Sequence, residues 1–179
     1  GRWFVPLCGR TRDIAWLLEQ GFRVAGAELV VIAVEALFTE LGLQPVITSS
    51  GKLKHYQAGK LEIFLGDIFD LTPAQLGPVD AIYDRAALVA LPETMRRDYA
   101  AKLVELAPRA SQLLLCFEYD QNTMPGPPFS VDAAEVATHY RKHYHCERLS
   151  RKPLQENLKG VTPATNNVWL LMPRYSRFE

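Results

Sequence analysis

The chain has 179 residues, 48% of them hydrophobic, and its 20 basic residues balance its 20 acidic residues to a formal net charge of zero. A chain of this size can bury a sizeable core, so we expect a single domain over residues 1–179. Zero net charge excludes the basic field that gathers nucleic acid or an anionic membrane, and we therefore expect a small-molecule partner, no nucleic acid and no membrane.

The cysteines and the chain's start favour a cytoplasmic protein. Cys8, Cys116 and Cys146 are odd in number and show no C-x-x-C spacing, which is typical of reduced thiols. Neither a signal peptide nor an apolar stretch of about 18 residues is visible. We expect a monomer, because the sequence shows no oligomer interface. Since the chain begins at Gly1 and enters an apolar run at Trp3, we also expect an N-terminal truncation.

The first half of the chain alternates between strand and helix patterns. Residues 3–7 form a short apolar run, and helical spacing follows until Gly21. A second apolar run over residues 22–27 precedes another helical pattern with a glycine at its end. Residues 44–60 contain turn signals and predict a small hairpin before a strand over residues 61–65.

The second half continues the same alternation. It predicts, in order, a strand over residues 79–83, a helix from Pro92 to Leu106, a strand over residues 113–117, a rigid loop at Pro125-Gly126-Pro127-Pro128, a capping box at Asp132 and Glu135, and a strand over residues 168–172. No segment repeats another, so the pattern is that of one continuous α/β unit.

Alternating strands and helices predict an α/β fold with a mostly parallel sheet and helices on both faces, because parallel strands need crossover connections. Ligands in such folds bind at the carboxyl ends of the strands. The candidate site residues are therefore those just after each strand, at positions 7–10, 28, 66–70, 84–85 and 118–130.

Three residues at these strand ends indicate a nucleotide-like cofactor. The first loop has Gly9 but not the G-x-G-x-x-G of a dinucleotide site, and one glycine still permits close backbone approach. Glu28 follows Gly9 by nineteen positions, where a carboxylate can accept both hydroxyls of a ribose; the alternative is an exposed loop glutamate. Asp67 lies where it can meet a purine amino group, or it is a turn or cap aspartate.

Other chemistry-bearing residues have simpler alternatives. Arg85, beside Asp84 at a strand end, can hold a carboxylate or offset the charge of a bound anion, or it forms a structural salt bridge. The segment HYRKHYHC, residues 139–146, has ligand-like spacing, but it runs from a helix into a strand, which would scatter its side chains. We expect no metal site. Cys8 at a helix N-terminus could be a nucleophile, although no histidine pairs with it evidently.

Five segments in order carry a resemblance to a known family: FVPLCGRTRD, VAGAEL, GDIFDL, YDRAALVAL and PGPPFSV. Together they closely resemble the thiopurine S-methyltransferase family, particularly its bacterial members, over essentially the whole chain. The resemblance implies the Rossmann-like fold of S-adenosylmethionine-dependent methyltransferases, with a mostly parallel seven-stranded sheet whose last strand is antiparallel. It also implies S-adenosylmethionine as the cofactor, which has no pyrophosphate, so that one glycine in the first loop suffices.

The same resemblance assigns the cofactor-binding residues. Leu7 and Gly9 are expected to line the cofactor. Glu28 is expected to hold the ribose hydroxyls, and Asp67 with Ile68 to contact the adenine.

Arg85 corresponds to the family's arginine beside cofactor and substrate, and it is the expected catalytic residue. The chain departs from the family pattern at Val30-Val31, where relatives often carry a serine and an acid, and at Ala86, where DRGAL is usual. The family has an N-terminal segment that folds over the site, and we expect this segment to be missing from a chain that begins at Gly1. Lys159 is the nearest candidate for a basic residue that the family places near the substrate late in the chain.

The resemblance implies methyl transfer to the sulfur of acidic heteroaromatic thiols such as thiopurines, with selenium or tellurium oxyanions as further acceptors, a detoxification activity. Such a displacement needs alignment in a dry pocket, and an acceptor that is already ionised needs no strong general base. A NAD(P)-dependent oxidoreductase and a non-catalytic nucleotide-binding module are the alternatives.

Overall fold

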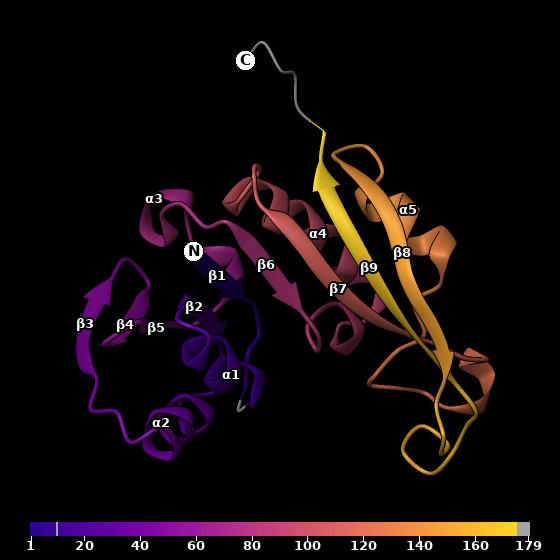
Figure 1. The fold of residues 1–179 in the computed structure, drawn as a ribbon, viewed down its shortest axis with the longest axis horizontal. Coiled ribbons are helices and arrows are strands. Elements are labelled where there is room, and N and C mark those ends of the chain that lie inside the picture. The colour runs from indigo at the N-terminus through magenta and orange to yellow at the C-terminus, as the bar shows by residue number, and fades with distance from the viewer. Residues whose placement is uncertain (10, 175–179) are drawn as a thin grey trace. The chain divides into compact units, whose positions relative to one another are not determined.

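The computed structural model describes residues 1–9 and 11–174, so position 10 of the expected first loop lies outside the described residues. The chain divides into two compact units, Gly1–Tyr83 and Asp84–Glu179. Each unit has strands and helices of its own, which Figure 1 labels in chain order.

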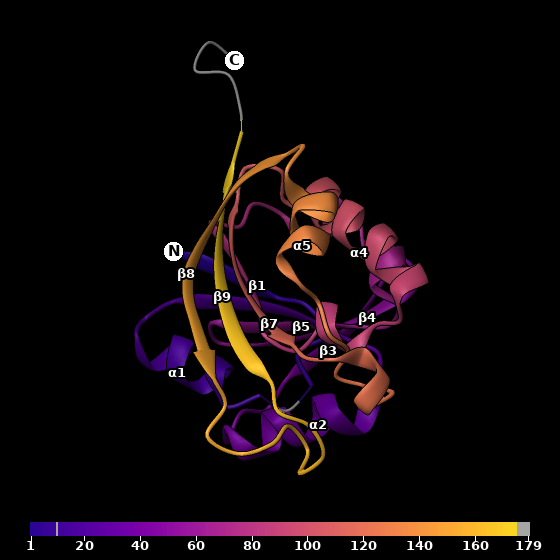
Figure 2. The ribbon, with the colours of Figure 1, turned by 90° about the vertical axis from the view of Figure 1, so that its right-hand side faces the viewer.

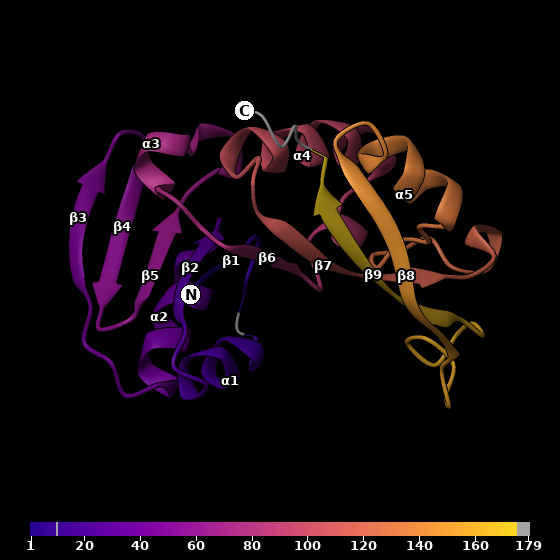
Figure 3. The same cartoon turned by 45° about the horizontal axis from the view of Figure 1, so that its top comes forward.

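The first unit is built on a parallel sheet with a hairpin added at one side. Its elements are β1 (Arg2–Val5), α1 (Asp13–Glu19), β2 (Arg23–Glu28), α2 (Val31–Glu40), β3 (Val46–Ser50), β4 (Leu53–Ala58), β5 (Leu61–Leu65), the 3-10 helix η1 (Ile68–Asp70), α3 (Pro73–Leu76) and β6 (Ala81–Asp84), whose last residue opens the second unit. The strand order is β3-β4-β5-β2-β1-β6. The four strands from β5 to β6 pair in parallel, whereas β3 and β4 form the predicted hairpin, and β4 continues the sheet antiparallel to β5 (Figure 3).

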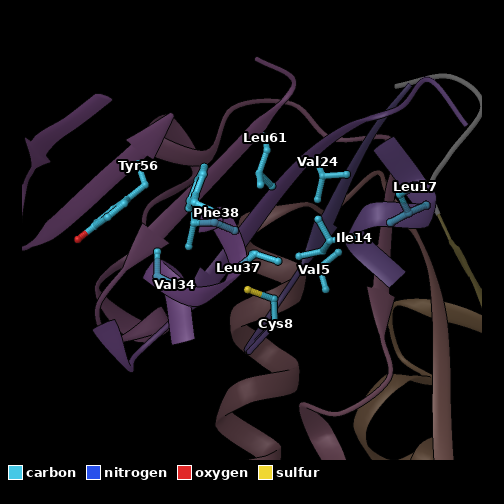
Figure 4. Close-up of a cluster of buried hydrophobic side chains, with 11 residues drawn as sticks. Val5, Cys8, Ile14, Leu17, Val24, Val34, Leu37, Phe38, Tyr56 and Leu61 are labelled. Carbon is cyan, nitrogen blue, oxygen red and sulfur yellow. The ribbon is translucent and has the colours of Figure 1, made fainter. Parts of the chain in front are cut away.

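The core of the first unit lies between this sheet and the helices α1 and α2. Apolar side chains from β1, α1, β2 and α2 meet there, because each helix turns its apolar stripe toward the strands. Figure 4 shows Cys8 within this cluster, near Val5, Ile14 and Leu37, all of them buried. The loop after β1 is thus anchored to the core by its own cysteine.

The second unit combines an antiparallel sheet with two helices. Its elements are η2 (Leu88–Ala90), α4 (Glu93–Leu106), β7 (Ser111–Glu118), η3 (Gln121–Thr123), α5 (Ala133–Tyr140), β8 (Tyr144–Pro153) and β9 (Thr165–Pro173). The strand order is β7-β9-β8, and β9 pairs antiparallel with both neighbours. Helices α4 and α5 pack against each other on one side of these strands (Figure 2).

These elements confirm the expected α/β fold and correct its details. The described residues form nine strands rather than seven, because the hairpin strands β3 and β4 join the sheet. The antiparallel late strand is β9, as the resemblance implied. The first strand ends at Val5 and not at Leu7, since Pro6 has no N–H to donate and Leu7 adopts a positive φ of 47°. The expectation of a single domain stays a prediction.

Helix starts follow the local chemistry of the sequence. Asp132 caps α5, because its carboxylate accepts a hydrogen bond from the Glu135 backbone N–H at 2.9 Å. The Glu135 side chain does not complete the predicted capping box, since it binds Arg96 and His139 instead. No helix in the described part of the chain is long and apolar enough to cross a membrane.

Candidate functional site

The carboxyl ends of three parallel strands meet at one edge of the first unit's sheet. Hydrogen bonding continues past the strands themselves: the Cys8 N–H donates to the Ala27 carbonyl at 3.0 Å, and the Gly66 N–H donates to the Glu28 carbonyl at 2.9 Å. The loop after β1, the end of β2 and the loop after β5 therefore lie together, as the parallel topology predicts.

Glu28 is the central residue of this edge. It is only 9% exposed. Its Oε1 accepts a hydrogen bond from the Gly9 backbone N–H at 2.9 Å, and its Oε2 accepts one from the Val30 backbone N–H at 2.8 Å. An ionised carboxylate has about four acceptor positions, so each oxygen keeps one for a ligand. A ribose diol can donate a hydrogen bond from each hydroxyl to such acceptors. The burial of Glu28 contradicts the alternative of an exposed loop glutamate.

The loop that faces Glu28 turns sharply through two left-handed residues. Leu7 and Gly9 have φ angles of 47° and 53°. A leucine in this region is uncommon and costs backbone strain, a feature that concentrates at functional loops. The atom nearest to a Cβ added at Gly9 would be the Glu28 Oε1, at 3.8 Å, so the backbone angle rather than lack of space favours glycine there. The loop thus presents backbone groups to a ligand beside the carboxylate.

Helix α2 begins at the two valines that follow β2 closely, Val30 and Val31. Val30 is the N-cap residue, and its side chain provides no cap. The Val30 backbone N–H instead donates a hydrogen bond to the Glu28 carboxylate. The carboxylate therefore lies at the N-terminus of α2, where the first N–H groups of a helix have no partner within the helix.

Asp67 and Ile68 follow β5 at the same edge. The Asp67 Oδ1 accepts a hydrogen bond from the Phe69 N–H at 2.9 Å and caps η1, so the cap interpretation describes its contact within the protein. The Asp67 side chain is exposed, whereas Ile68 is buried. Their contact with an adenine stays a prediction.

Cys8 lacks the environment of a nucleophile. The thiol is buried in the core, and burial, with the nearby Glu28 charge, raises its pKa to about 12. A nucleophilic cysteine needs the opposite, a partly exposed thiol with a lowered pKa. The structure explains its presence by packing, since a Cβ added at Gly26 would lie 3.1 Å from the Cys8 sulfur.

In the second unit, Asp84 organises the turn that carries Arg85. The Asp84 carboxylate is fully buried, and its Oδ1 accepts hydrogen bonds from the Ala87 and Leu88 N–H groups at 3.1 and 3.2 Å. Its Oδ2 accepts one from the Tyr99 hydroxyl at 2.8 Å. Burial raises the pKa of Asp84 to about 6, although these hydrogen bonds oppose the shift. The aspartate therefore fixes the backbone immediately after Arg85.

This turn forms part of the wall of a cavity of about 500 Å³ within the second unit. Most of the wall is apolar and is formed by Val89, Leu115, Phe117, Pro127, Pro128 and Leu154. Ala86 also lies in the wall. Three residues with polar side chains complete it: Arg85, Lys159 and Asn166. An apolar cavity with a few polar groups is the usual form of a small-molecule site, and two cations favour an anionic ligand. The sequence identified Arg85 and Lys159 but not Asn166.

The proline-rich segment of this wall is held in place by hydrogen bonds, as expected of a rigid loop. The Tyr119 hydroxyl donates to the Pro128 carbonyl at 2.7 Å, and the Phe129 N–H donates to the Val89 carbonyl at 2.7 Å. The Arg96 guanidinium lies 5.7 Å from the centre of the Phe129 ring. The wall residues next to these contacts are therefore positioned before any ligand binds.

The histidine-rich segment runs from a helix into a strand, as predicted. His139 lies on α5 and contacts the Glu135 carboxylate at 2.8 Å, whereas His145 and Cys146 lie on β8. Across residues 1–9 and 11–174, no group of three or more histidine, cysteine, aspartate or glutamate side chains could hold a metal ion.

The chain is similar to a known protein family. A model of the thiopurine S-methyltransferase family matches residues 1–172. The chain is 58% identical over 170 residues to a protein named thiopurine S-methyltransferase from Xanthobacter autotrophicus, covering 95% of this chain and 80% of that relative. It is 50% identical over 171 residues to one of the same name from Teredinibacter turnerae, covering 96% of this chain and 80% of that relative.

Solved structures of methyltransferases share the fold. An S-adenosylmethionine-dependent methyltransferase from Methanosarcina mazei aligns with a TM-score of 0.70 at 14% identity, covering 96% of this chain and 92% of that chain. The 1,6-didemethyltoxoflavin-N1-methyltransferase of Burkholderia thailandensis, solved with S-adenosylhomocysteine bound, aligns with a TM-score of 0.61 at 18% identity, covering 96% and 71%. At these identities the likeness concerns the fold alone.

Proposed function

The chain belongs to the thiopurine S-methyltransferase family, and we propose that it transfers a methyl group from S-adenosylmethionine to the sulfur of an anionic aromatic or heterocyclic thiol, such as a thiopurine. The observation that carries this proposal is the Glu28 carboxylate, buried at a strand end and fixed by the N–H groups of Gly9 and Val30. Family membership favours this activity over an oxidoreductase or a non-catalytic nucleotide-binding module.

The first unit would hold the cofactor by its ribose and by its methionine part. The Glu28 carboxylate accepts hydrogen bonds from the ribose hydroxyls, since its oxygens keep free acceptor positions after accepting from two backbone N–H groups. Leu7 and Gly9 provide the backbone of the loop beside it, and Asp67 and Ile68 are the candidates for contact with the adenine. When bound, S-adenosylmethionine supplies an electrophilic methyl group on a sulfonium sulfur.

The second unit would hold the acceptor in its apolar cavity. The positive charges of Arg85 and Lys159 favour the thiolate over the thiol, because an adjacent cation lowers the pKa of an acid. Such an acceptor arrives ionised, so no side chain of this chain is required as a general base. The apolar wall excludes water, which strengthens the attraction between thiolate and guanidinium. Arg85 is the proposed catalytic residue on this basis.

Methylation of selenium or tellurium oxyanions, a role in detoxification, a cytoplasmic location and a monomeric state stay predictions. The cavity's apolar wall supports an aromatic acceptor more directly than an inorganic oxyanion, because a small hydrated ion gains nothing from apolar surface.

Thermal unfolding in the presence of candidate cofactors tests the proposal. S-adenosylmethionine and S-adenosylhomocysteine should raise the Tm of the full-length protein in a concentration-dependent manner, because a ligand that binds only the folded state stabilises it. NAD should leave the Tm unchanged, and Glu28→Ala should remove most of the shift. A shift with NAD and none with S-adenosylhomocysteine would overturn the assignment.

A further inference from the structure

Asn166 is a polar residue on an otherwise apolar part of the cavity wall. It lies on β9, directly opposite Phe117 of β7, and the next pair on the same face is Val168 and Leu115. Opposed residues of neighbouring strands share one face of a sheet, so Asn166 projects on the side of Phe117 and Leu115, both of which line the cavity. Figure 1 shows β9 running beside β7.

The position on this face of the sheet accounts for the apolar residues Phe117 and Leu115, but it does not account for an asparagine at position 166. Thr165 projects to the opposite side, where it lines a separate polar cavity, and Asn167 on that same side is 1% exposed. At position 166 an apolar residue would continue the wall formed by Phe117 and Leu115 without the cost of desolvating an amide. An amide that faces such a wall is stabilised when a ligand hydrogen-bonds to it.

The hydrogen-bonding groups of the Asn166 side chain are available to bind a ligand. Among residues 1–9 and 11–174, the Asn166 side chain makes no hydrogen bond to another residue, and the Lys159 ammonium group makes no hydrogen bond or ion pair. An asparagine amide has two donors on its nitrogen and an acceptor oxygen, and can therefore pair with a ligand edge that offers an acceptor next to a donor. The lysine ammonium group has donors only. It can neutralise a negative charge, but it cannot accept a hydrogen bond from the donor on such an edge.

We propose that Asn166 determines acceptor specificity by hydrogen-bonding the nitrogen-bearing edge of a heteroaromatic thiol, an inference that rests on the proposed function of this cavity. A purine-like ring carries ring nitrogens and N–H groups side by side, which match the amide. A simple benzene thiol has the same apolar faces and the same reactive sulfur but no such edge. The enzyme should therefore distinguish these two acceptors through Asn166.

The test compares two acceptors with matched variants of the full-length protein. Asn166→Leu keeps the size of the side chain and removes its hydrogen bonds, and should lower kcat/KM for 6-mercaptopurine about 10-fold or more while leaving kcat/KM for benzenethiol within about 2-fold. Asn166→Ser keeps one hydroxyl and should give an intermediate loss with 6-mercaptopurine. Thr165→Val, on the opposite face of the same strand, is the control and should change neither.

Equal losses with both acceptors, or no loss with 6-mercaptopurine, would overturn the role of Asn166. If Asn166→Leu does not fold, the same comparison of the two acceptors is made with Asn166→Ser. An equal change in kcat/KM for both acceptors in that variant also contradicts the proposal. If the wild-type protein methylates neither thiol, the proposed function fails; calorimetry of 6-mercaptopurine binding to wild type and Asn166→Ser then tests the asparagine separately, and equal affinities overturn it.

Discussion

The Glu28 carboxylate and the Gly9 backbone N–H, nineteen positions apart in the sequence, are joined by a hydrogen bond of 2.9 Å. The bond links the end of β2 to the loop after β1 and fixes the direction of the carboxylate before any ligand arrives. A group held in this way loses little side-chain entropy on binding, so more of the hydrogen-bond energy contributes to affinity.

Replacing Glu28 should weaken binding of S-adenosylmethionine. Glu28→Ala leaves the ribose hydroxyls without a charged acceptor, which we expect to cost roughly 1.5 to 3 kcal/mol, or about 10- to 150-fold in Kd measured by calorimetry. Glu35→Ala, on the exposed face of α2, is the matched control and should bind normally. Unchanged cofactor affinity in a folded Glu28→Ala variant would exclude the ribose role.

Arg85 variants should separate charge from geometry in catalysis. Arg85→Lys keeps the positive charge but loses the planar guanidinium, so we expect lower turnover of an anionic thiol, and Arg85→Ala should lower it further. Arg97→Ala, which removes an exposed arginine of α4, should behave like wild type. Wild-type turnover in Arg85→Ala, with folding confirmed by circular dichroism, would rule out a catalytic role.

The proximity of Gly9 and Glu28 could be predicted from the sequence because it depends on topology. Parallel strands bring their carboxyl ends together, so a glutamate after the second strand had to lie near the glycine after the first. The same reasoning could not decide what Asp67 does, because capping a short helix and meeting a ligand require the same residue type at the same place. The structure shows the cap.

Other features depend on contacts that a single sequence does not reveal. The strand β3 carries exposed apolar residues, Val46 and Ile47, and the turn signals of residues 44–60 predicted a hairpin but not that it would extend the sheet. Asn166 follows Thr165 in a polar stretch typical of a loop, and only the pairing with Phe117 places it on the cavity wall. The buried Asp84 carboxylate accepts a hydrogen bond from Tyr99, fifteen positions away, which the sequence pattern does not indicate.

Asp84 should make stability depend on pH. Its pKa in the folded state is about 6, above the ordinary 3.8, because the carboxylate is buried. The folded state therefore holds this proton more tightly, and the contribution of Asp84 to stability is full below about pH 4 and is lost as the pH rises through 6. The loss amounts to about 3 kcal/mol.

Denaturant unfolding of wild type and Asp84→Asn checks this dependence. The asparagine cannot ionise, so the difference in unfolding free energy between the two proteins should shift in favour of the variant as the pH rises from about 4 to 6.5, and then remain constant. A difference that does not change with pH over this range would contradict the burial of an ionisable carboxyl group at this position.

The core cysteines should resist alkylation in the folded protein. Burial raises the pKa of Cys8 to about 12 and that of Cys116 still further, and both thiols are shielded from solvent. Iodoacetamide at about pH 8 should modify either one at least about 100-fold more slowly than in the unfolded chain, as followed by peptide mass spectrometry. Rapid modification of Cys8 under native conditions would show that the loop after β1 opens and that its thiol is reactive.

The most direct measurement is the identification of products after the full-length protein is incubated with S-adenosylmethionine and 6-mercaptopurine. We expect S-methylated mercaptopurine and S-adenosylhomocysteine in equal amounts by mass spectrometry, with the yield sharply reduced in both Glu28→Ala and Arg85→Ala. Absence of the S-methylated product from the folded wild-type protein, or methylation only at a ring nitrogen, would contradict the assignment of this chain as a thiol methyltransferase.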